Sequence, residues 1–172
     1  NYTWDELNNR FDELHDFYPN IISERMIIGQ SIEGRDIWAF KISDNPNIDE
    51  DEPEVLYTAL THAREPVGMM NLFYFVQHIA EAYGIDTELT FLVNNREMWF
   101  IPVVNPDGYI FNESIEPDGG GMHRKNRLDT NCGDGTNRGV DLNRNYSFGW
   151  GADNSGSSPY PCSTTYRGES AF

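Results

Sequence analysis

Residues 55–66 read Val-Leu-Tyr-Thr-Ala-Leu-Thr-His-Ala-Arg-Glu-Pro, so an apolar run passes directly into a polar stretch. The apolar run predicts a buried strand, and in open α/β sheets ligands bind at the carboxyl ends of strands. His62 and Glu65 lie at that end, and one imidazole nitrogen with one carboxylate oxygen suits Zn²⁺ as a pair of ligands. A catalytic zinc site needs three protein ligands, so this pair must be completed elsewhere.

The segments on either side of this stretch show alternating helical and extended patterns. Thr3 and Glu6 are spaced as in a capping box, and apolar residues recur at helical spacing as far as about Tyr18. Further elements are predicted as strands over 25–31, 35–42 and 97–104, a largely buried helix over 66–84, and a helix or extended turn over 87–94. From Asn105 onward the chain reads as loop. The alternation predicts a three-layer α/β fold.

The size and charge of the chain limit its class. A length of 172 residues with 38% hydrophobic content is enough for a single domain over residues 1–172. No apolar run of about 18 residues is present, so we expect no membrane-spanning segment. The net charge of −16 argues against nucleic acid and against an anionic membrane as partners, and we attribute it mainly to solubility.

Basic residues gather in one part of this acidic chain. Between positions 121 and 146 the chain carries Arg124, Lys125, Arg127, Arg138 and Arg144. Such an island in a glycine-rich segment predicts a local anion site, because arginine forks bind carboxylates bidentately. Next to a metal ion, it would describe a site for an anionic substrate with a polarisable carbonyl.

Two further polar residues extend this prediction. Asn143 adds a hydrogen-bond donor beside Arg144, and Asp141 is suited to hold the second ring nitrogen of a metal-bound histidine. Other site motifs are missing from the sequence, since it contains no EF-hand calcium loop, no phosphate-binding loop and no His-Glu-x-x-His.

The two cysteines, Cys132 and Cys162, flank the same segment. They either form a disulfide, worth about 3.5 kcal/mol in the chain-entropy account, or remain two free thiols, and we favour the disulfide. Their spacing is not that of a zinc site. Because a disulfide indicates an oxidising compartment and Asn1 to Trp4 lack the pattern of a leader peptide, we expect the mature form of a secreted or periplasmic protein.

Four motifs in order then resemble one family. They are His62-Ala63-Arg64-Glu65, Asn105-Pro106-Asp107-Gly108-Tyr109, Arg124-Lys125-Asn126-Arg127 and Gly139-Val140-Asp141-Leu142-Asn143-Arg144-Asn145. With these motifs the chain resembles the zinc carboxypeptidases of the carboxypeptidase A/B type, the funnelins of peptidase family M14. The resemblance covers essentially the whole chain and implies a mixed, mostly parallel twisted sheet.

The resemblance implies a role for each matching residue around one Zn²⁺ per complete site. His62 and Glu65 correspond to zinc ligands, and Asp141 to the residue that holds the His62 ring. Arg124 corresponds to the arginine that polarises the scissile carbonyl. The chemistry implied is attack by a zinc-bound water on the last peptide bond.

The remaining correspondences concern the substrate, which would be the C-terminus of a peptide or protein. Asn143 and Arg144 correspond to the pair that grips the terminal carboxylate, and Arg64 to an accessory arginine in the outer pocket. Holding the chain end in this way would explain why only the last bond is cut.

The match is incomplete in one respect. The family's third zinc ligand, a histidine, and its general-base glutamate correspond to positions after Phe172, and neither His78 nor His123 occupies the ligand position. We therefore expect this chain to be the N-terminal part of a catalytic domain, inactive alone, with the missing C-terminal part as its partner. The determinants of side-chain preference would also follow Phe172.

Two other functions remain open from the sequence. The first is a zinc amidohydrolase of the same superfamily that acts on a peptidoglycan stem peptide or an acylated amino acid. The second is a non-catalytic, carboxypeptidase-like binding module, against which the intact Arg124, Asn143 and Arg144 argue.

Overall fold

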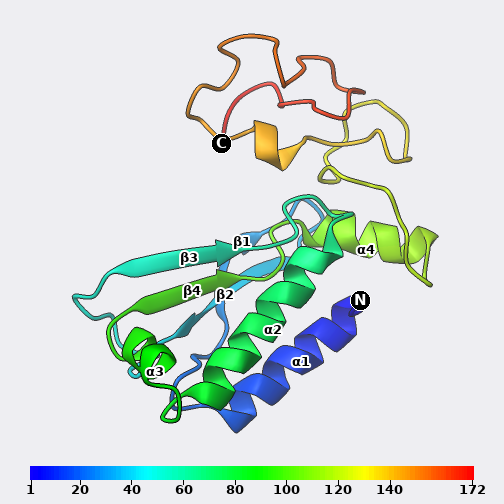
Figure 1. Cartoon of the computed structure of the whole chain (residues 1–172). Helices are drawn as coiled ribbons and strands as arrows, with labels where there is room; N and C mark the ends of the chain where they lie inside the picture. Colours follow the sequence, from blue (N-terminus) through cyan, green and yellow to red (C-terminus); the bar gives the residue numbers. More distant parts are fainter. The chain divides into compact units, whose positions relative to one another are not determined.

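The computed structural model describes all of residues 1–172 (Figure 1). The chain divides into two compact units. Unit 1 comprises residues 1–29, 36–59 and 67–104, and unit 2 comprises residues 30–35, 60–66 and 105–172. The single domain expected over residues 1–172 stays a prediction.

Helices and strands alternate along the first part of the chain, as the sequence patterns predict. The elements are α1 (Trp4–Phe17), β1 (Met26–Gln30), β2 (Asp36–Ile42), β3 (Glu54–Thr58), α2 (Pro66–Ala82), α3 (Thr87–Val93), β4 (Glu97–Ile101), α4 (Pro106–Ile115) and the 3₁₀ helix η1 (Leu142–Arg144). The segment expected to be a helix or an extended turn is the helix α3.

Unit 1 is built on a four-stranded mixed sheet with the order β1-β2-β4-β3. β2 pairs with β4 antiparallel and β3 pairs with β4 parallel. β1 and β3 lie at the two edges, where all five residues of β1 are exposed and Leu56 of β3 is 60% exposed. The prediction of a buried strand before His62 is therefore wrong for β3. An edge strand pairs on one side only, so its apolar residues need not be enclosed.

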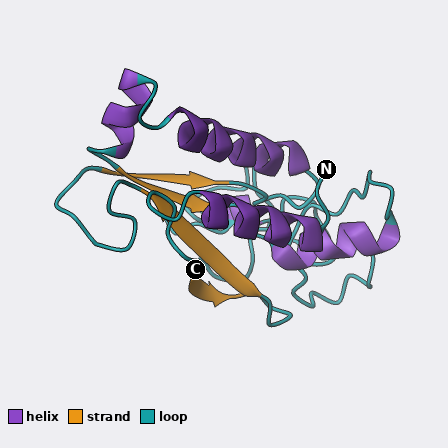
Figure 2. Ribbon diagram, turned by 90° about the horizontal axis from the view of Figure 1, so that it is seen from below, coloured by secondary structure: helices purple, strands orange, loops and turns teal.

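One face of the sheet carries the aromatic core of unit 1. Phe40 and Phe100 lie opposite each other, with ring centroids 5.2 Å apart. The ring of Phe11 on α1 lies 4.9 Å from Phe40, and the ring of Phe75 on α2 lies 6.3 Å from Phe100. Both long helices therefore cover the same face of the sheet, side by side (Figure 1, Figure 2). The predicted α/β class is confirmed, and unit 1 supplies one helical layer.

The first helix forms where its capping signal predicts. The Thr3 side chain accepts a hydrogen bond from the Glu6 N–H, and the Glu6 carboxylate accepts one from the Thr3 N–H, so the capping box is complete. α2 differs from its prediction. Only one side of this helix is buried, since Val67 is 73% and Tyr74 is 70% exposed.

Unit 2 contains a helix where the sequence was expected to be loop. α4 begins after Asn105, whose side chain accepts a hydrogen bond from the Gly108 N–H at 3.1 Å. Pro106 at the first position lacks only an N–H that would have no helical partner. The rest of unit 2 consists mainly of turns and loops, with the 3₁₀ helix η1 and an isolated β-bridge between Ser158 and Tyr166. None of the helices combines the length and apolarity that crossing a membrane requires.

The aromatic core should dominate the stability of unit 1. Phe40 is completely buried, so we expect Phe40→Ala to lower the free energy of unfolding by about 3–5 kcal/mol through lost burial and a cavity. Ile27 on β1 is 62% exposed, so Ile27→Ala should change it by about 0.5 kcal/mol or less. Urea denaturation measures both variants. Similar losses in the two variants would contradict this location of the core.

Candidate functional site

The structure brings four of the predicted site residues together in unit 2: His62, Glu65, Arg124 and Asp141. The loop that holds His62 is joined to the segment of Arg124 by a hydrogen bond from the Ala63 N–H to the Arg124 carbonyl at 3.1 Å. The chain enters this loop through Leu60, whose φ of 51° lies in the left-handed region. A bulky residue holds such a conformation only where its surroundings fix it.

Both ring nitrogens of His62 face carboxylates. Nδ1 lies 3.0 and 3.1 Å from the two oxygens of Glu65, and Nε2 lies 3.1 Å from Oδ1 of Asp141. A neutral imidazole has one N–H and can donate to only one of these groups. The side chain of Asp141 is fully buried, whereas that of Glu65 is 58% exposed. The N–H of the ring is therefore needed more by Asp141, which water cannot reach, than by Glu65.

This arrangement fits a metal ion on the Glu65 side of the ring. With the Nε2 proton donated to Asp141, Nδ1 directs its lone pair at the Glu65 oxygens. Two acceptors in contact repel each other unless a cation lies between them. A carboxylate on the second nitrogen is also the usual support of a histidine that binds zinc. His62 and Glu65 are therefore the residues of this site that could hold zinc.

Asp141 also holds Arg124 and the turn that follows it. Its Oδ2 accepts hydrogen bonds from Nε and Nη2 of Arg124, both at 3.0 Å. Its Oδ1 accepts a further bond from the Asn143 N–H at 3.1 Å. A fully buried carboxylate must be paired with cations and donors to remain charged, and these contacts meet that need.

Arg124 uses one edge of its guanidinium for Asp141. The remaining nitrogen, Nη1, lies 3.7 Å from Oε1 of Glu65, and the side chain is 14% exposed. The guanidinium therefore lies next to the carboxylate that could hold a metal ion. Its free edge can donate to an oxygen that becomes negative during a reaction.

Helix α4 supports both segments of the site. Asn105 donates from Nδ2 to the Lys125 carbonyl at 2.9 Å, next to the Arg124 segment. A Cβ at Gly108 would lie 2.7 Å from Cβ of Ala63 and 2.7 Å from the Lys125 carbonyl oxygen. Only glycine allows the two segments to approach the helix this closely. The Asn-Pro-Asp-Gly motif thus has a structural basis.

A reciprocal pair of hydrogen bonds attaches His123 to α4. Asn112 accepts from the His123 N–H at 2.7 Å and donates to the His123 carbonyl at 2.8 Å. The imidazole is buried against Phe111, and Nε2 lies 3.1 Å from the Asn126 carbonyl. Burial lowers the pKa of His123, outweighing the backbone contact that favours its charged form. His123 therefore has a structural position beside the site.

The basic island divides into two groups. Lys125 donates to the carbonyls of Pro161 and Ser163, and Arg127 donates to those of Asp134 and Gly135. Arg138 donates to the Arg127 carbonyl and pairs with Asp134. These three cations hold loops together, so the prediction of one anion site for all five basic residues is wrong. Arg124 and Arg144 remain as candidates.

The loops of this region are also held covalently. Cys132 and Cys162 form the predicted disulfide. Gly139 has a φ of +97°, and a Cβ there would lie 1.8 Å from the Asn126 carbonyl oxygen. The close approach permits the hydrogen bond from the Asn126 N–H to the Val140 carbonyl at 3.0 Å. It places the chain directly before Asp141 against the Arg124 segment.

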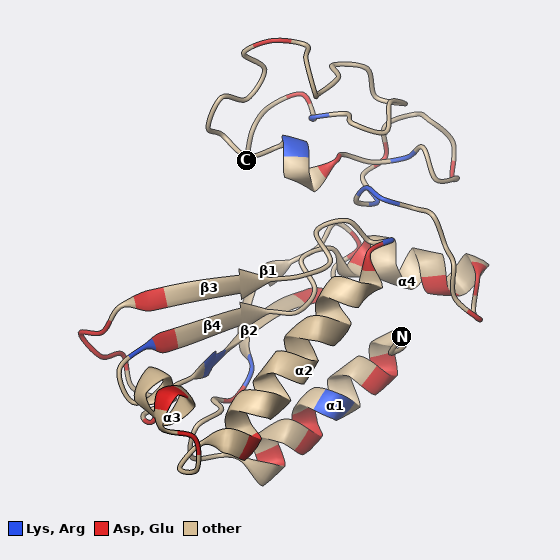
Figure 3. Cartoon of the chain, viewed as in Figure 1, with Lys and Arg blue, Asp and Glu red and all other residues tan.

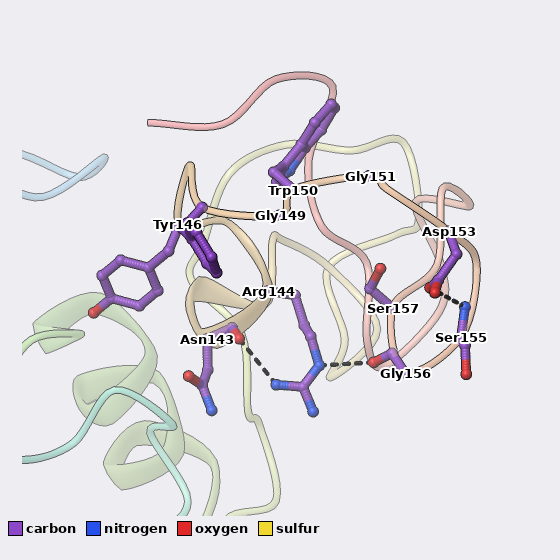
Figure 4. A pocket seen from close by; sticks show the side chains of 11 residues that line it. Asn143, Arg144, Tyr146, Gly149, Trp150, Gly151, Asp153, Ser155, Gly156 and Ser157 are labelled. Carbon is purple, nitrogen blue, oxygen red and sulfur yellow. Dashed lines mark hydrogen bonds between the residues drawn. The ribbon is translucent and has the colours of Figure 1, made fainter.

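Asn143 and Arg144 line a pocket of about 300 Å³ within unit 2 (Figure 4). Arg144 donates from Nε to the Gly156 carbonyl at 2.7 Å and from Nη1 to the Asn143 carbonyl at 2.9 Å. These two bonds fix the plane of the guanidinium, and Nη2 takes no part in them. The pocket thus offers a fixed cation with a remaining donor and, from Asn143, an exposed amide.

The sequence analysis missed the residues that line the rest of this pocket. The loop 146–157 supplies them, and it includes Tyr146, Phe148 and Trp150. Three aromatic residues at alternate positions directly after Arg144 were a usable signal. Phe148 is fully exposed at the wall of this pocket.

Comparison with known proteins identifies the family. A sequence profile described as zinc carboxypeptidase matches residues 7–172. The chain belongs to the zinc carboxypeptidase family. The family inferred from the four sequence motifs is thereby confirmed.

Individual relatives agree with this assignment. A zinc carboxypeptidase of Saccharothrix mutabilis subsp. capreolus is 38% identical over 134 residues, which are 78% of this chain and 29% of that protein. An inactive metallocarboxypeptidase of Ajellomyces dermatitidis is 35% identical over 163 residues, 92% of this chain and 26% of that protein. The crystal structure of carboxypeptidase A from Helicoverpa armigera has a TM-score of 0.81 at 32% identity, and the match covers 99% of this chain and 39% of that one.

This zinc carboxypeptidase chain spans between about a quarter and two fifths of the length of those relatives. Its other histidines have contacts of their own. His15 contacts the Ile22 carbonyl at 3.0 Å, and His78 on α2 is exposed and stacks on Tyr74. Arg64, the predicted accessory residue, is partly exposed between His62 and Glu65 in the loop after β3.

The buried Lys125 should give this zinc carboxypeptidase a distinct pH dependence. Burial lowers the pKa of Lys125 from 10.5 to about 8, with Asp141 opposing the shift. Between about pH 8 and 10.5 the unfolded chain keeps this proton while the folded chain loses it, so stability should rise with pH. Lys125→Met should remove up to about 1.4 kcal/mol per pH unit from that slope. Urea denaturation across this range measures it, and equal slopes for the two proteins would contradict the prediction.

Proposed function

We propose that the protein containing this chain is a zinc-dependent carboxypeptidase that hydrolyses the last peptide bond of peptides or proteins. One observation carries the proposal. His62 is held by the buried Asp141 with Nδ1 directed at Glu65, and the same Asp141 holds Arg124 and the turn of Asn143. A metal-ligand pair and two groups suited to a carboxylate substrate are thus joined by a single carboxylate.

The chain's own residues would each have a separate task. Zinc bound by His62 and Glu65 would supply a Lewis acid and a water of lowered pKa. Asp141 keeps the His62 ring in the orientation and tautomer that leave Nδ1 unprotonated. Nη1 of Arg124 donates to the carbonyl oxygen of the bond being cut as that oxygen becomes negative.

The pocket of Arg144 would make the enzyme an exopeptidase. Its guanidinium is fixed by two backbone carbonyls, so little rotational freedom is lost when a carboxylate binds. Asn143 adds an amide donor at the same edge. Binding energy at the chain end would then position the last peptide bond for reaction. Arg64 would contact the substrate further from the chain end.

Two parts of the proposal concern the whole protein. We propose that residues 1–172 alone are inactive, because His62 and Glu65 are two of the three protein ligands that a catalytic zinc site requires. We also propose a secreted or periplasmic location, which the disulfide between Cys132 and Cys162 supports.

A second candidate is a non-catalytic binding module, which the similarity to an inactive metallocarboxypeptidase favours. Zinc content and hydrolysis of a peptide with a free C-terminus, measured on the full-length protein, separate the two. Stoichiometric zinc with hydrolysis of the last bond supports the carboxypeptidase. Zinc without hydrolysis of this peptide or of an acylated amino acid would favour the binding module.

Asp141 should control the affinity of the full-length protein for zinc. We expect Asp141→Asn to weaken zinc binding by about 10- to 100-fold, because the amide no longer fixes the His62 ring as a charged acceptor. Competition with a chromophoric chelator measures the dissociation constant.

The matched control for this experiment is Asp107→Asn. The side chain of Asp107 is 1% exposed, and it accepts hydrogen bonds from Ser31, the Glu33 N–H and Arg35 within the same unit. This change should lower stability and leave the zinc affinity of the folded protein unaltered. Equal zinc affinity in wild type and Asp141→Asn would refute the role assigned to Asp141.

Arg144 should decide whether the enzyme requires a free chain end. We expect Arg144→Ala to lower kcat/KM about 100-fold for a free-acid peptide, since a charge-assisted pair is lost, and to change little for the amidated peptide. Arg138→Ala removes a cation that bonds only to the loop of Arg127 and Asp134, and should preserve the preference. A preference for the free acid that survives in Arg144→Ala would exclude this clamp.

A further inference from the structure

Acidic residues crowd one end of the sheet in unit 1. Six of the eleven positions from 44 to 54 are Asp or Glu, and the last of them, Glu54, is the first residue of β3. Glu97 is the first residue of β4. Figure 3 shows this acidic loop and the acidic starts of β3 and β4 lying side by side.

The sheet register brings two of these carboxylates directly together. Glu54 and Glu97 are partners in the parallel pair of β3 and β4. One oxygen each from Asp49, Glu54 and Glu97 lies within 4.8 Å of the other two. Like charges directly opposite each other destabilise a sheet, so this pairing needs a compensating positive charge.

Lys41 compensates only part of this charge. Glu97 is completely buried, and its Oε1 accepts hydrogen bonds from Lys41 Nζ and from the Glu50 N–H at 3.0 Å. Its Oε2 is buried and has no hydrogen-bond partner. Burial alone would raise the pKa of Glu97, but the bonds from Lys41 and Glu50, the charge of Lys41 and a contribution from the Trp99 side chain outweigh it and lower that pKa. The group is therefore a carboxylate with one oxygen unsatisfied inside the cluster.

The loop adds three more buried oxygens of the same kind. Oδ1 of Asp44, Oε2 of Glu50 and Oε2 of Glu52 are buried without a hydrogen-bond partner. Burial raises the pKa of Glu52, the charges of Glu50, Asp44 and Glu97 raise it further, and the charge of Arg96 opposes the shift. Buried polar atoms in proteins are almost always paired, and an ion is one of the few explanations for a group of exceptions. A merely solvated acidic loop would direct these oxygens to water.

The donor set selects the kind of ion. All the available atoms are oxygens and most are carboxylate, which excludes the nitrogen and sulfur sites that zinc prefers. Ca²⁺ accepts six to eight oxygens in irregular geometry, whereas Mg²⁺ demands a regular octahedron and retains much of its water. We infer that Asp49, Glu54 and Glu97, with neighbouring oxygens of the 44–54 loop, bind a structural Ca²⁺ that joins this loop to the starts of β3 and β4.

The test uses the full-length protein with its zinc concentration held constant, so that the two metals are not confused. Calcium is titrated by calorimetry, and Tm is measured with and without calcium or magnesium. We expect about one calcium per chain and a rise in Tm of roughly 3 °C at a calcium concentration tenfold above Kd, with a much smaller rise in magnesium. No calcium binding, or an equal effect of magnesium, would overturn the inference.

The variants Asp49→Asn and Glu54→Gln test the site while leaving the pair of Lys41 and Glu97 intact. Both side chains are exposed, so we expect the variants to fold and to bind calcium at least 10-fold more weakly. Glu116→Gln removes an exposed carboxylate at the end of α4 in unit 2 and serves as the charge-matched control. Calcium affinity that is the same in all four proteins would refute the site.

Trp99 provides an independent spectroscopic readout. It lies two residues after Glu97 on the same strand and opposite Leu56, so it shares the sheet face of Glu97 and Glu54. Terbium, used as the probe, should show luminescence sensitised by tryptophan that calcium displaces, and Trp99→Phe should remove most of it. A sensitised signal that persists in Trp99→Phe would place the ion elsewhere.

Discussion

The buried carboxylate of Asp141 is the interaction on which the candidate site depends. It receives the His62 ring and the guanidinium of Arg124 from two other segments of the chain, and the N–H of Asn143 from its own turn. A fully buried charge is costly, and these donors are what make it tolerable. The dependence is mutual, because removing the carboxylate would leave a buried guanidinium edge and an unoriented imidazole. Metal binding, carbonyl polarisation and the position of the substrate clamp are therefore coupled through one side chain.

Close backbone contacts make this convergence possible. Gly108 lets α4 touch both the His62 loop and the Arg124 segment, and Gly139 lets the chain before Asp141 pass against Asn126. Neither glycine carries chemistry, yet a methyl group at either position would overlap backbone atoms. The glycines between the candidate site residues are thus limited in the side chain that they can carry. This explains why the motifs include residues without a reactive side chain.

The sequence was most informative where a local rule decides the structure. The capping box of Thr3 and Glu6 predicts the start of α1, and the motifs identify the family together with its α/β fold. It was least informative where tertiary contacts decide. α4 was missed because the helix after its Asn105 cap is only ten residues long. β3 was expected to be buried because an apolar run does not reveal that a strand lies at the edge of a sheet. From the sequence, Lys125 and Arg127 were expected to bind an anion. The structure shows that both side chains instead donate hydrogen bonds to backbone carbonyls.

The two units differ in how their buried carboxylates are satisfied, and this difference bears on the interpretation of the net charge of −16. In unit 2 each buried carboxylate of the site region, such as Asp141 or Asp107, is satisfied by protein donors. In unit 1 the loop before β3 collects carboxylates with Lys41 as the one cation bonded among them, and several buried oxygens have no donor. Solubility explains exposed charge but not buried charge without partners.

A nitrogen and a carboxylate held by donors suit zinc, whereas carboxylates facing one another suit a hard cation with many oxygen ligands. The same residue type thus builds two sites that would not compete for the same metal.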